Sequence, residues 1–219
     1  MNPESNDKEL NEKKWMSIKD WKSQKAPYFK KNPGIEGMIA LEWAKKAIAK
    51  GKVLDIGCGA GRNSILFAKN GFKVIGIDFS KTAIKLANIL RQEEKSKADF
   101  KVQSALNLTF KENYFDLIMD FGCFHHLRKN QWSKYEMQVL RALKPKAHFI
   151  LYCFSKESKE TGNYSKGKDY SIRNKAYNRY FSQKDLQEIF GKRFKIIKKK
   201  TIKEKGRLLA FNLALMQRI

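Results

Sequence analysis

One stretch of ten residues, 53–62, constrains the fold of this chain most, because it joins a short apolar run, three glycines and the start of a helix. The run Val-Leu-Asp-Ile at 53–56 is typical of a strand buried on both faces. A helix is expected over residues 63–70, which include apolar Ile65, Leu66 and Ala68. Glycines in the intervening turn permit backbone angles closed to other residues and let a ligand approach the main chain without meeting a Cβ. The stretch therefore predicts a site for a nucleotide-like cofactor.

The spacing of the glycines narrows the choice of cofactor. Dinucleotide-binding folds use G-x-G-x-x-G, in which the third glycine lets the helix pack closely against the strand. This chain has G-x-G-x-G at 57, 59 and 61, and Arg62 stands where the third dinucleotide glycine would be. A second strand, expected over 72–77, stops at Asp78, whose carboxylate is placed to accept both hydroxyls of a ribose. The spacing disfavours a nicotinamide oxidoreductase.

With these residues the chain resembles class I S-adenosylmethionine (SAM) dependent methyltransferases, over residues 50–154. Similar motifs follow in order: 53–61 as the glycine turn, 78–80 at the ribose, 103–105 at the adenine, 114–118 as the fourth strand and 140–151 as a helix end and fifth strand. The resemblance implies SAM as cofactor and S-adenosylhomocysteine as product. It also implies these cofactor contacts: Asp55, which orients the methionine amino end, and Gly57, Cys58, Gly59, Gly61, Asn63, Asp78, Phe79, Ser80, Ser104, Ala105, Asp120 and Phe121. The family's third motif usually carries Asp where this chain has Ser104, so the adenine amino group is held more weakly, or through Ser104 and the backbone beside it.

Strands alternate with helices along the rest of the chain, which predicts an α/β fold. We expect a doubly wound three-layer sandwich with a mostly parallel seven-stranded sheet, whose antiparallel last strand the resemblance places between the fifth and the sixth. The expected helices cover 35–49, 80–96 with Ser80 as N-cap, 131–143 ended by Lys144-Pro145, and 182–190; further strands cover 100–104, 115–120, 147–154, 194–201 and 208–216, the last two joined by a hairpin at 203–207.

The chain is expected to form one domain from residue 15 onward. Residues 1–14 are polar and lack periodicity, which predicts a frayed or disordered end. Residues 15–49 form an N-terminal helical cap, and residues 155–180 an inserted loop in which Lys and Arg alternate with Tyr. Residues 192–207 are also rich in lysine and indicate an edge strand with charged outward positions.

The segment after the fourth strand, residues 120–127, carries the candidate chemistry. Ligands of a doubly wound sheet gather beyond the carboxyl ends of its strands, so this segment should face the transferable methyl group. Methyl transfer from a sulfonium is an in-line displacement and needs a base only when the acceptor must lose a proton. His125 or His126 is suited to that role because imidazole titrates near neutral pH. The alternative is structural: one histidine packs on the following helix and the other bonds the loop.

The acceptor is expected to be a small molecule with an O, N or S nucleophile. The segment after the fourth strand lacks the Pro-Pro-aromatic motif typical of enzymes that methylate adenine or glutamine amides. The expected substrate pocket is lined by Trp21, Tyr28, Phe29, His125 and Tyr170. Two alternatives stay open: an RNA methyltransferase that uses the basic and tyrosine-rich surface, or a SAM-binding protein without turnover.

The strongly positive net charge of the chain supports the alternative of an RNA methyltransferase. The chain has 46 Lys and Arg against 22 Asp and Glu, a formal charge of +24, which favours anionic partners, although an ordinary lysine-rich surface gives the same count. Cys58, Cys123 and Cys153 have no metal or disulfide spacing and are expected to be reduced core thiols. The three histidines have no cysteine or carboxylate at the sequence spacing of metal ligands, so we expect no bound metal. The polar N-terminus and the lack of a long apolar run indicate no signal peptide and no membrane span, which favours the cytoplasm. The sequence does not indicate an oligomeric state.

Overall fold

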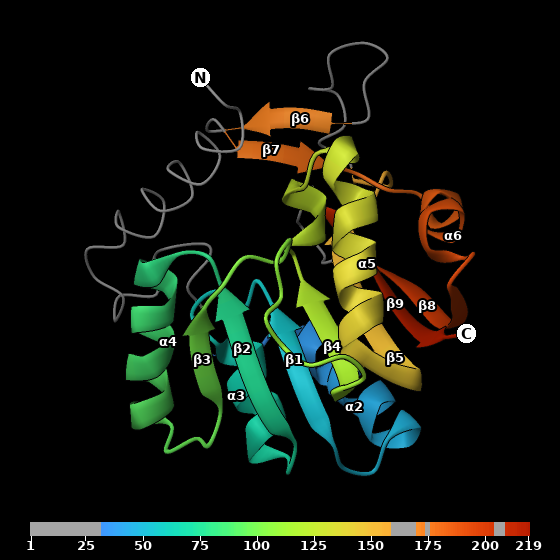
Figure 1. Cartoon of the computed structure of the whole chain (residues 1–219). Helices are drawn as coiled ribbons and strands as arrows, with labels where there is room; N and C mark the ends of the chain where they lie inside the picture. Colours follow the sequence, from blue (N-terminus) through green and yellow to red (C-terminus); the bar gives the residue numbers. More distant parts are fainter. Residues whose placement is uncertain (1–31, 159–169, 174–175, 204–208) are drawn as a thin grey trace. The chain divides into compact units, whose positions relative to one another are not determined.

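The computed structural model describes residues 32–158, 170–173, 176–203 and 209–219 (Figure 1). The chain divides into two compact units, one up to Leu108 and one from Thr109 onward. The expectation of one domain from residue 15 stays a prediction, and the expected frayed end at 1–14 lies outside the described residues.

The first unit contains three parallel strands and their connecting helices. In chain order it has α2 (Ile35–Ala47), β1 (Lys52–Ile56), α3 (Arg62–Lys69), β2 (Lys73–Asp78), α4 (Lys81–Glu93) and β3 (Asp99–Val102). The strands lie in the order β3-β2-β1. Residues 53–56 of β1 are fully buried, as the apolar run predicts. Figure 1 shows α4 beside β3 and α3 behind β2.

Local sequence accounts for the start of α4. The Ser80 hydroxyl accepts a hydrogen bond from the Ala83 backbone N–H at 3.0 Å, which confirms the predicted N-cap. The helix then buries an apolar stripe at positions three and four apart: Ala83, Ile84, Leu86, Ala87 and Leu90. The N-cap fixes the point at which the chain turns from β2 into the helix, and so fixes the end of β2 at Asp78.

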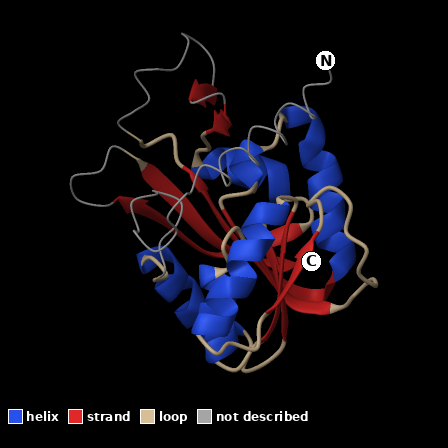
Figure 2. Ribbon diagram, turned by 90° about the vertical axis from the view of Figure 1, so that its left-hand side faces the viewer, coloured by secondary structure: helices blue, strands red, loops and turns tan. Residues whose placement is uncertain are grey.

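The second unit contains the remaining four strands of the sheet. Its elements are β4 (Phe115–Phe121), the short helices η2 (Phe124–His126) and η3 (Lys129–Gln131), α5 (Trp132–Ala142), β5 (Leu143–Phe154), β6 (Tyr170–Arg173), β7 (Ala176–Arg179), α6 (Gln183–Phe190), β8 (Phe194–Lys203) and β9 (Ala210–Arg218). These four lie in the order β4-β5-β9-β8, with β9 antiparallel to both β5 and β8. The predicted fold class is thereby confirmed: a seven-stranded, mostly parallel sheet with an antiparallel last strand, and helices between strands (Figure 2).

An aromatic cluster forms the core of the second unit. Phe124 of η2 lies at its centre, with its ring 5.2 Å from that of Tyr135, 5.1 Å from Phe181 and 5.1 Å from Phe190. All four side chains are buried. Burying rings of this size contributes on the order of 2 kcal/mol each, so the cluster fixes η2 against α5 and α6.

The prediction of a strand over 147–154 was wrong about where that strand begins. The structure extends β5 back to Leu143, directly after α5, because Leu143 is buried and pairs with Phe115. The ladder register then shifts, and Leu117 pairs with His148. Pro145 lies in this irregular part of the strand, where its missing N–H leaves no ladder bond unmade.

The prediction that 155–180 is entirely loop was also wrong. Strands β6 and β7 form a two-stranded antiparallel sheet in which Tyr170 pairs with Arg179 and Ser171 with Asn178. The rings of Tyr170 and Tyr177 lie 5.1 Å apart across this hairpin. Cross-strand aromatic contacts of this kind stabilise short hairpins, whereas the sequence pattern predicts that the tyrosines form a ligand surface.

Two further predictions concern the burial of the cysteines and the lack of a helix that could span a membrane. No disulfide joins the three cysteines, and only Cys153 is fully buried, whereas Cys58 and Cys123, predicted to be core thiols, are partly exposed. Both of these lie in turns that follow strands, β1 and β4, and not in the strands themselves. Within the described ranges, no helix is long and apolar enough to cross a membrane.

Candidate functional site

The glycine turn of the first unit has the left-handed backbone that its sequence predicts. The φ angles are 69° at Gly57, 55° at Gly59 and 83° at Gly61, a region that side chains rarely adopt. Gly61 is also the N-cap residue of α3, and a Cβ built there would lie 2.5 Å from the Phe100 ring on β3. Gly61 is therefore required twice, by its backbone angle and by the close packing of α3 against β3.

Asp78 connects the glycine turn to the end of β2. One oxygen of its buried carboxylate accepts a hydrogen bond from the Gly59 N–H at 3.1 Å, and the other accepts one from the Ser80 N–H at 2.9 Å. The Cys58 N–H donates to the Ile77 carbonyl at 2.9 Å. An ionised carboxylate accepts hydrogen bonds on both of its oxygens, and the two amides hold this one at the end of β2. This donor and acceptor set fits the ribose of a nucleoside.

The other predicted cofactor contacts of this unit lie on β1, on α3 and directly after β2 and β3. Asp55 is buried in β1 and accepts a hydrogen bond from the Ser64 hydroxyl at 2.5 Å. Asn63 is buried in the first turn of α3, and Phe79 is half-buried. Ser104 and Ala105 are half-buried after β3, and the Ser104 hydroxyl accepts from the Leu106 N–H at 3.2 Å.

An ion pair that the sequence pattern does not predict lies beside the glycine turn. Arg62 Nη2 lies 2.8 Å from Glu36 Oε1, and the Glu36 side chain is only 5 % exposed. Glu36 stands in the first turn of α2, where a negative charge is favourable. The pair holds α2 against the start of α3. Only the unusual Arg62 at the end of the glycine motif could have pointed to it.

Asp120 is the polar centre of the second unit. Its carboxylate, fully buried, accepts hydrogen bonds from the backbone N–H groups of Gly122, Cys123 and Phe124 at 2.7–3.0 Å and from the Tyr135 hydroxyl at 2.5 Å. Burial raises the pKa of Asp120 from 3.8 to about 6, although these donors act to lower it. Burial and the adjacent carboxylate also raise the pKa of Tyr135. Asp120 therefore shapes the turn after β4, and its predicted contact with the cofactor stays a prediction, as does that of half-buried Phe121.

The two candidate histidines follow in η2 and have opposite hydrogen-bonding roles. His125 is 4 % exposed, and its Nδ1 accepts a hydrogen bond from the Phe154 N–H at 3.3 Å, so the neutral ring carries its proton on Nε2. His126 Nδ1 lies 2.9 Å from the Tyr177 carbonyl oxygen, which can only accept, so Nδ1 carries the proton. The Nε2 atom of His126 is then the basic nitrogen. The two histidine ring centroids lie 4.3 Å apart.

Neighbouring residues explain why the histidines are held in place. Phe124 is buried in the aromatic cluster, which orients η2. The Phe154 ring stacks on His125 at 4.0 Å. Gly122 has φ 101°, and a Cβ there would lie 3.2 Å from His125 Cε1. The sequence predicted the two histidines but not Phe154 or Tyr177, because these partners lie 29 and 51 residues away.

The predicted substrate-pocket residues divide into those that the structure describes and those that it does not. Tyr170 is half-buried in β6, on the hairpin whose other strand provides the carbonyl that binds His126. Trp21, Tyr28 and Phe29 lie outside the described residues. Across the described ranges, no group of three or more His, Cys, Asp and Glu side chains is arranged to hold a metal ion.

Comparison with known proteins adds to this geometry. A family model described as a methyltransferase domain matches residues 53–146. An uncharacterised methyltransferase of Schizosaccharomyces pombe is 33% identical over 107 residues, which cover 49% of this chain and 74% of that protein. The 2-heptyl-1-hydroxyquinolin-4(1H)-one methyltransferase of Mycobacteroides abscessus is 32% identical, over 53% of this chain and 52% of its own length. The mouse EEF1A lysine methyltransferase 2 is 36% identical, over 45% and 44%.

A solved structure extends the likeness over nearly the whole chain. The 1,6-didemethyltoxoflavin-N1-methyltransferase of Burkholderia thailandensis, solved with 1,6-didemethyltoxoflavin and S-adenosylhomocysteine, superposes with a TM-score of 0.75. The match covers 96% of this chain and 88% of that one, at 18% identity. At this identity the match concerns the fold alone.

Proposed function

This chain belongs to the class I SAM-dependent methyltransferases, and within that family we propose that it methylates an O, N or S nucleophile of a small-molecule acceptor. One observation carries the proposal: the Nδ1 atoms of two adjacent histidines after β4 have opposite partners, a backbone N–H for His125 and a carbonyl oxygen for His126, which favours opposite tautomers. Such a pair is suited to an acceptor that must be oriented and must lose a proton during transfer.

Different residues of the chain have different roles in the proposed reaction. Bound SAM supplies an electrophilic methyl group on a sulfonium. The glycine turn and Asp78 bind the adenosyl part, through backbone amides and a carboxylate prepared by two hydrogen bonds. His126 takes the acceptor proton on Nε2, and His125 orients the acceptor by donating from Nε2. Tyr170, Trp21, Tyr28 and Phe29 are proposed to line the acceptor side. Orientation alone can contribute roughly 7 to 11 kcal/mol to such a step.

Two considerations favour a small acceptor. Residues 120–123 read Asp-Phe-Gly-Cys and offer no Pro-Pro-aromatic motif for a flat exocyclic amine. The quinolone methyltransferase named above acts on a small ring system by its name. The lysine methyltransferase shows that a protein acceptor also occurs among relatives, so the test must include one.

The proposal is tested by following the methyl group. Purified protein is incubated with SAM labelled in the methyl group and, in parallel, with a small-metabolite extract, total RNA and a protein extract from one cell type. We expect label in the metabolite fraction, and loss of that label with His126→Gln. Label confined to RNA or to protein contradicts the small-molecule proposal. Absence of label in every pool, together with tight SAM binding by calorimetry, would favour the non-catalytic alternative.

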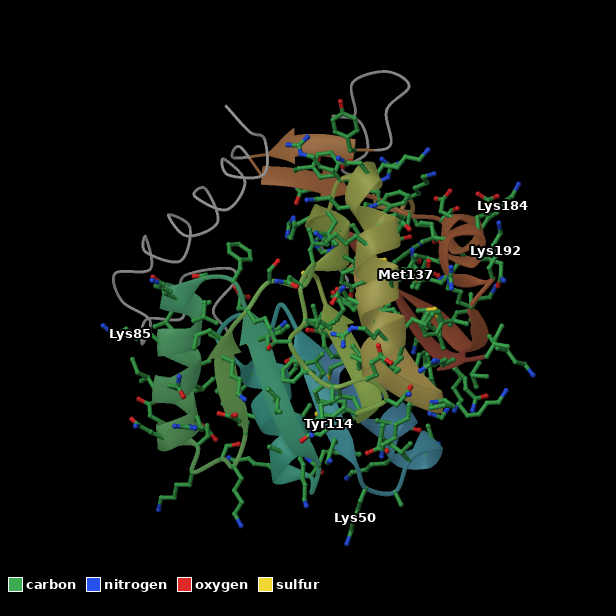
Figure 3. All side chains as sticks on the ribbon, viewed as in Figure 1. Lys50, Lys85, Tyr114, Met137, Lys184 and Lys192 are labelled. Atoms are coloured by element: carbon green, nitrogen blue, oxygen red, sulfur yellow. The ribbon has the colours of Figure 1, made fainter. Side chains whose placement is uncertain are left out.

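An RNA acceptor is the second candidate, and one surface favours it. Five lysines before and along the edge strand β8 are exposed, and none of them pairs with a carboxylate in the described part of the chain: Lys192, Lys195, Lys198, Lys199 and Lys200. Figure 3 shows Lys192 and Lys184 pointing outward near α6. Neutralising Lys198, Lys199 and Lys200 together should lower the salt dependence of RNA binding by about 2 in log–log slope. RNA binding that is absent at low salt would exclude this candidate.

We also propose a cytoplasmic location, which rests on the sequence pattern given above. Fractionation of cells that express the full-length protein, followed by immunodetection, tests it. Recovery in the membrane or secreted fraction would contradict it.

A further inference from the structure

The hairpin of β6 and β7 supports both histidines of the second unit. The Tyr177 carbonyl on β7 binds His126 Nδ1 at 2.9 Å. Tyr180, which follows β7, stacks on Phe154 at 5.1 Å, and Phe154 stacks on His125 at 4.0 Å. The segment from β7 to Tyr180 therefore determines where the polar ring atoms of η2 are held.

Two arginines fasten this hairpin to the segment after η2. The Arg128 guanidinium lies 5.0 Å from the centre of the Tyr177 ring. The Arg179 guanidinium lies 4.5 Å from the centre of the Trp132 ring, and its Nη1 donates to the Tyr177 hydroxyl at 3.3 Å. Trp132 is fixed in turn, since its Nε1 donates to the Leu127 carbonyl at 3.2 Å. The contacts cross in both directions, because Arg128 reaches from the η3 side to β7 and Arg179 reaches from β7 to α5.

We propose that Arg128 and Arg179 are positioning residues, which hold the Tyr177 carbonyl against His126 and thereby keep the His126 proton on Nδ1. This inference rests on the proposed function only in that His126 Nε2 takes the acceptor proton. A neutral imidazole away from a fixed acceptor can carry its proton on either nitrogen. Once the carbonyl moves away, part of the His126 population therefore carries a proton on Nε2 and cannot act as the base.

The guanidinium groups have a specific role in this arrangement. A cation over an aromatic face contributes about 0.5 to 2 kcal/mol, depending on how far water is excluded. Tyr177 is 8 % exposed and so sits in a largely dry environment. Arginine stacks flat on a ring and can donate at the same time, which lysine and glutamine cannot both do.

The tautomer of His126 is measured directly by ¹⁵N NMR on protein labelled at histidine. The chain has three histidines, and His126→Gln assigns the signal. In the unaltered protein we expect a protonated Nδ1 and an unprotonated Nε2. In Arg179→Gln the Nδ1-protonated share should fall at least twofold, and further in Arg128→Gln/Arg179→Gln. Arg193→Gln, which removes an arginine paired with Glu136, is the matched control and should leave the tautomer unchanged.

Each outcome decides the inference. A proton on Nε2 of His126 in the unaltered protein overturns it, and so does an unchanged tautomer in the folded double variant. Should Arg179→Gln lose its native circular dichroism, Arg128→Gln gives the same reading through the other contact. In the methyl-transfer assay, kcat should fall about tenfold in Arg179→Gln with KM for SAM unchanged. The NMR result stands without turnover, so a failure of the proposed function is distinguishable from a failure of this inference.

Discussion

The two units hold their polar groups by different means. In the first unit, one amide from the left-handed glycine turn and one from Ser80 bind Asp78, so the main chain makes the arrangement. In the second unit, the buried Tyr135 side chain joins three backbone amides on Asp120, and backbone groups distant in the sequence orient the histidines. A cradle made from the main chain responds to changes at glycine, whereas a network of side chains responds to the loss of single groups and to pH. The predictions below test that contrast.

The largest effect is expected at Gly61. Gly61→Val puts a branched side chain at φ 83° and drives its Cβ into the Phe100 ring, 2.5 Å away. Backbone strain of about 1–2 kcal/mol and overpacking of about 1–3 kcal/mol add to a loss of roughly 2 to 5 kcal/mol in the free energy of unfolding. Urea denaturation measures this loss, and calorimetry should detect no SAM binding.

Gly71 provides the matched control. Its φ is 90°, but a Cβ there meets nothing within 4 Å. Gly71→Ala should therefore lose only the backbone part, about 1 to 2 kcal/mol, and retain SAM affinity. Equal losses at the two glycines would show that the contact with Phe100 contributes nothing.

The second prediction concerns His126 in the other unit. His126→Gln keeps a polar side chain but removes the basic nitrogen, so kcat should fall about 100-fold, equivalent to about 3 kcal/mol. The dissociation constant for SAM should change less than twofold. Single-turnover methyl transfer and calorimetry measure the two quantities. An unchanged kcat would assign His126 to structure alone.

The contrast between the units also explains what the sequence could predict. Some features depend only on neighbours a few residues away: the glycine turn, the strand end at Asp78 and the N-cap at Ser80. Glycine, aspartate and serine are typical of these positions, so the sequence predicts them directly. The order β5-β9-β8 came from family resemblance, since periodicity does not specify the partner of a strand. The predicted elements agree with the structure to within a few residues wherever local pattern dominates.

The sequence could not predict the partners of the second unit. His125 and His126 are adjacent and chemically identical, and they acquire opposite tautomers only because Phe154 and Tyr177 approach from distant positions. Asp120 lies at the end of a strand, where the resemblance predicts a cofactor contact, but the backbone turn after β4 and Tyr135 bind its carboxylate. Tyr177 and Tyr180 resemble a stacking surface for bases in the sequence, yet both are buried.

The third prediction uses the raised pKa of Asp120. The folded-state pKa is about 6 against 3.8 for the ordinary group, so between these values the folded protein binds the proton more strongly than the unfolded chain. This group's contribution to stability is complete below about pH 4 and is lost as pH rises through about 6. The loss amounts to about 2 to 3 kcal/mol.

Asp120→Asn isolates that contribution. The variant cannot titrate at this position, so the difference in unfolding free energy, unaltered protein minus variant, should fall by about 2 to 3 kcal/mol from pH 4 to pH 7. Urea titrations at several pH values measure it, and the effects of other carboxylates cancel in the difference. A difference that is independent of pH would mean that Asp120 keeps its ordinary pKa in the folded protein.

The smallest effects are expected at two helix caps, one in each unit. Ser80 caps α4, and Ser182 forms a capping box with Asp185 at the start of α6. Ser80→Ala and Ser182→Ala should each lower the free energy of unfolding by about 1 kcal/mol. The two variants test the domain organisation, because each one lowers the midpoint of the unfolding transition to which its helix belongs. Under the predicted single domain from residue 15, both variants lower one common transition in calorimetry. If each variant shifts a separate transition, the unit up to Leu108 and the unit from Thr109 onward unfold independently, and the single-domain prediction is wrong.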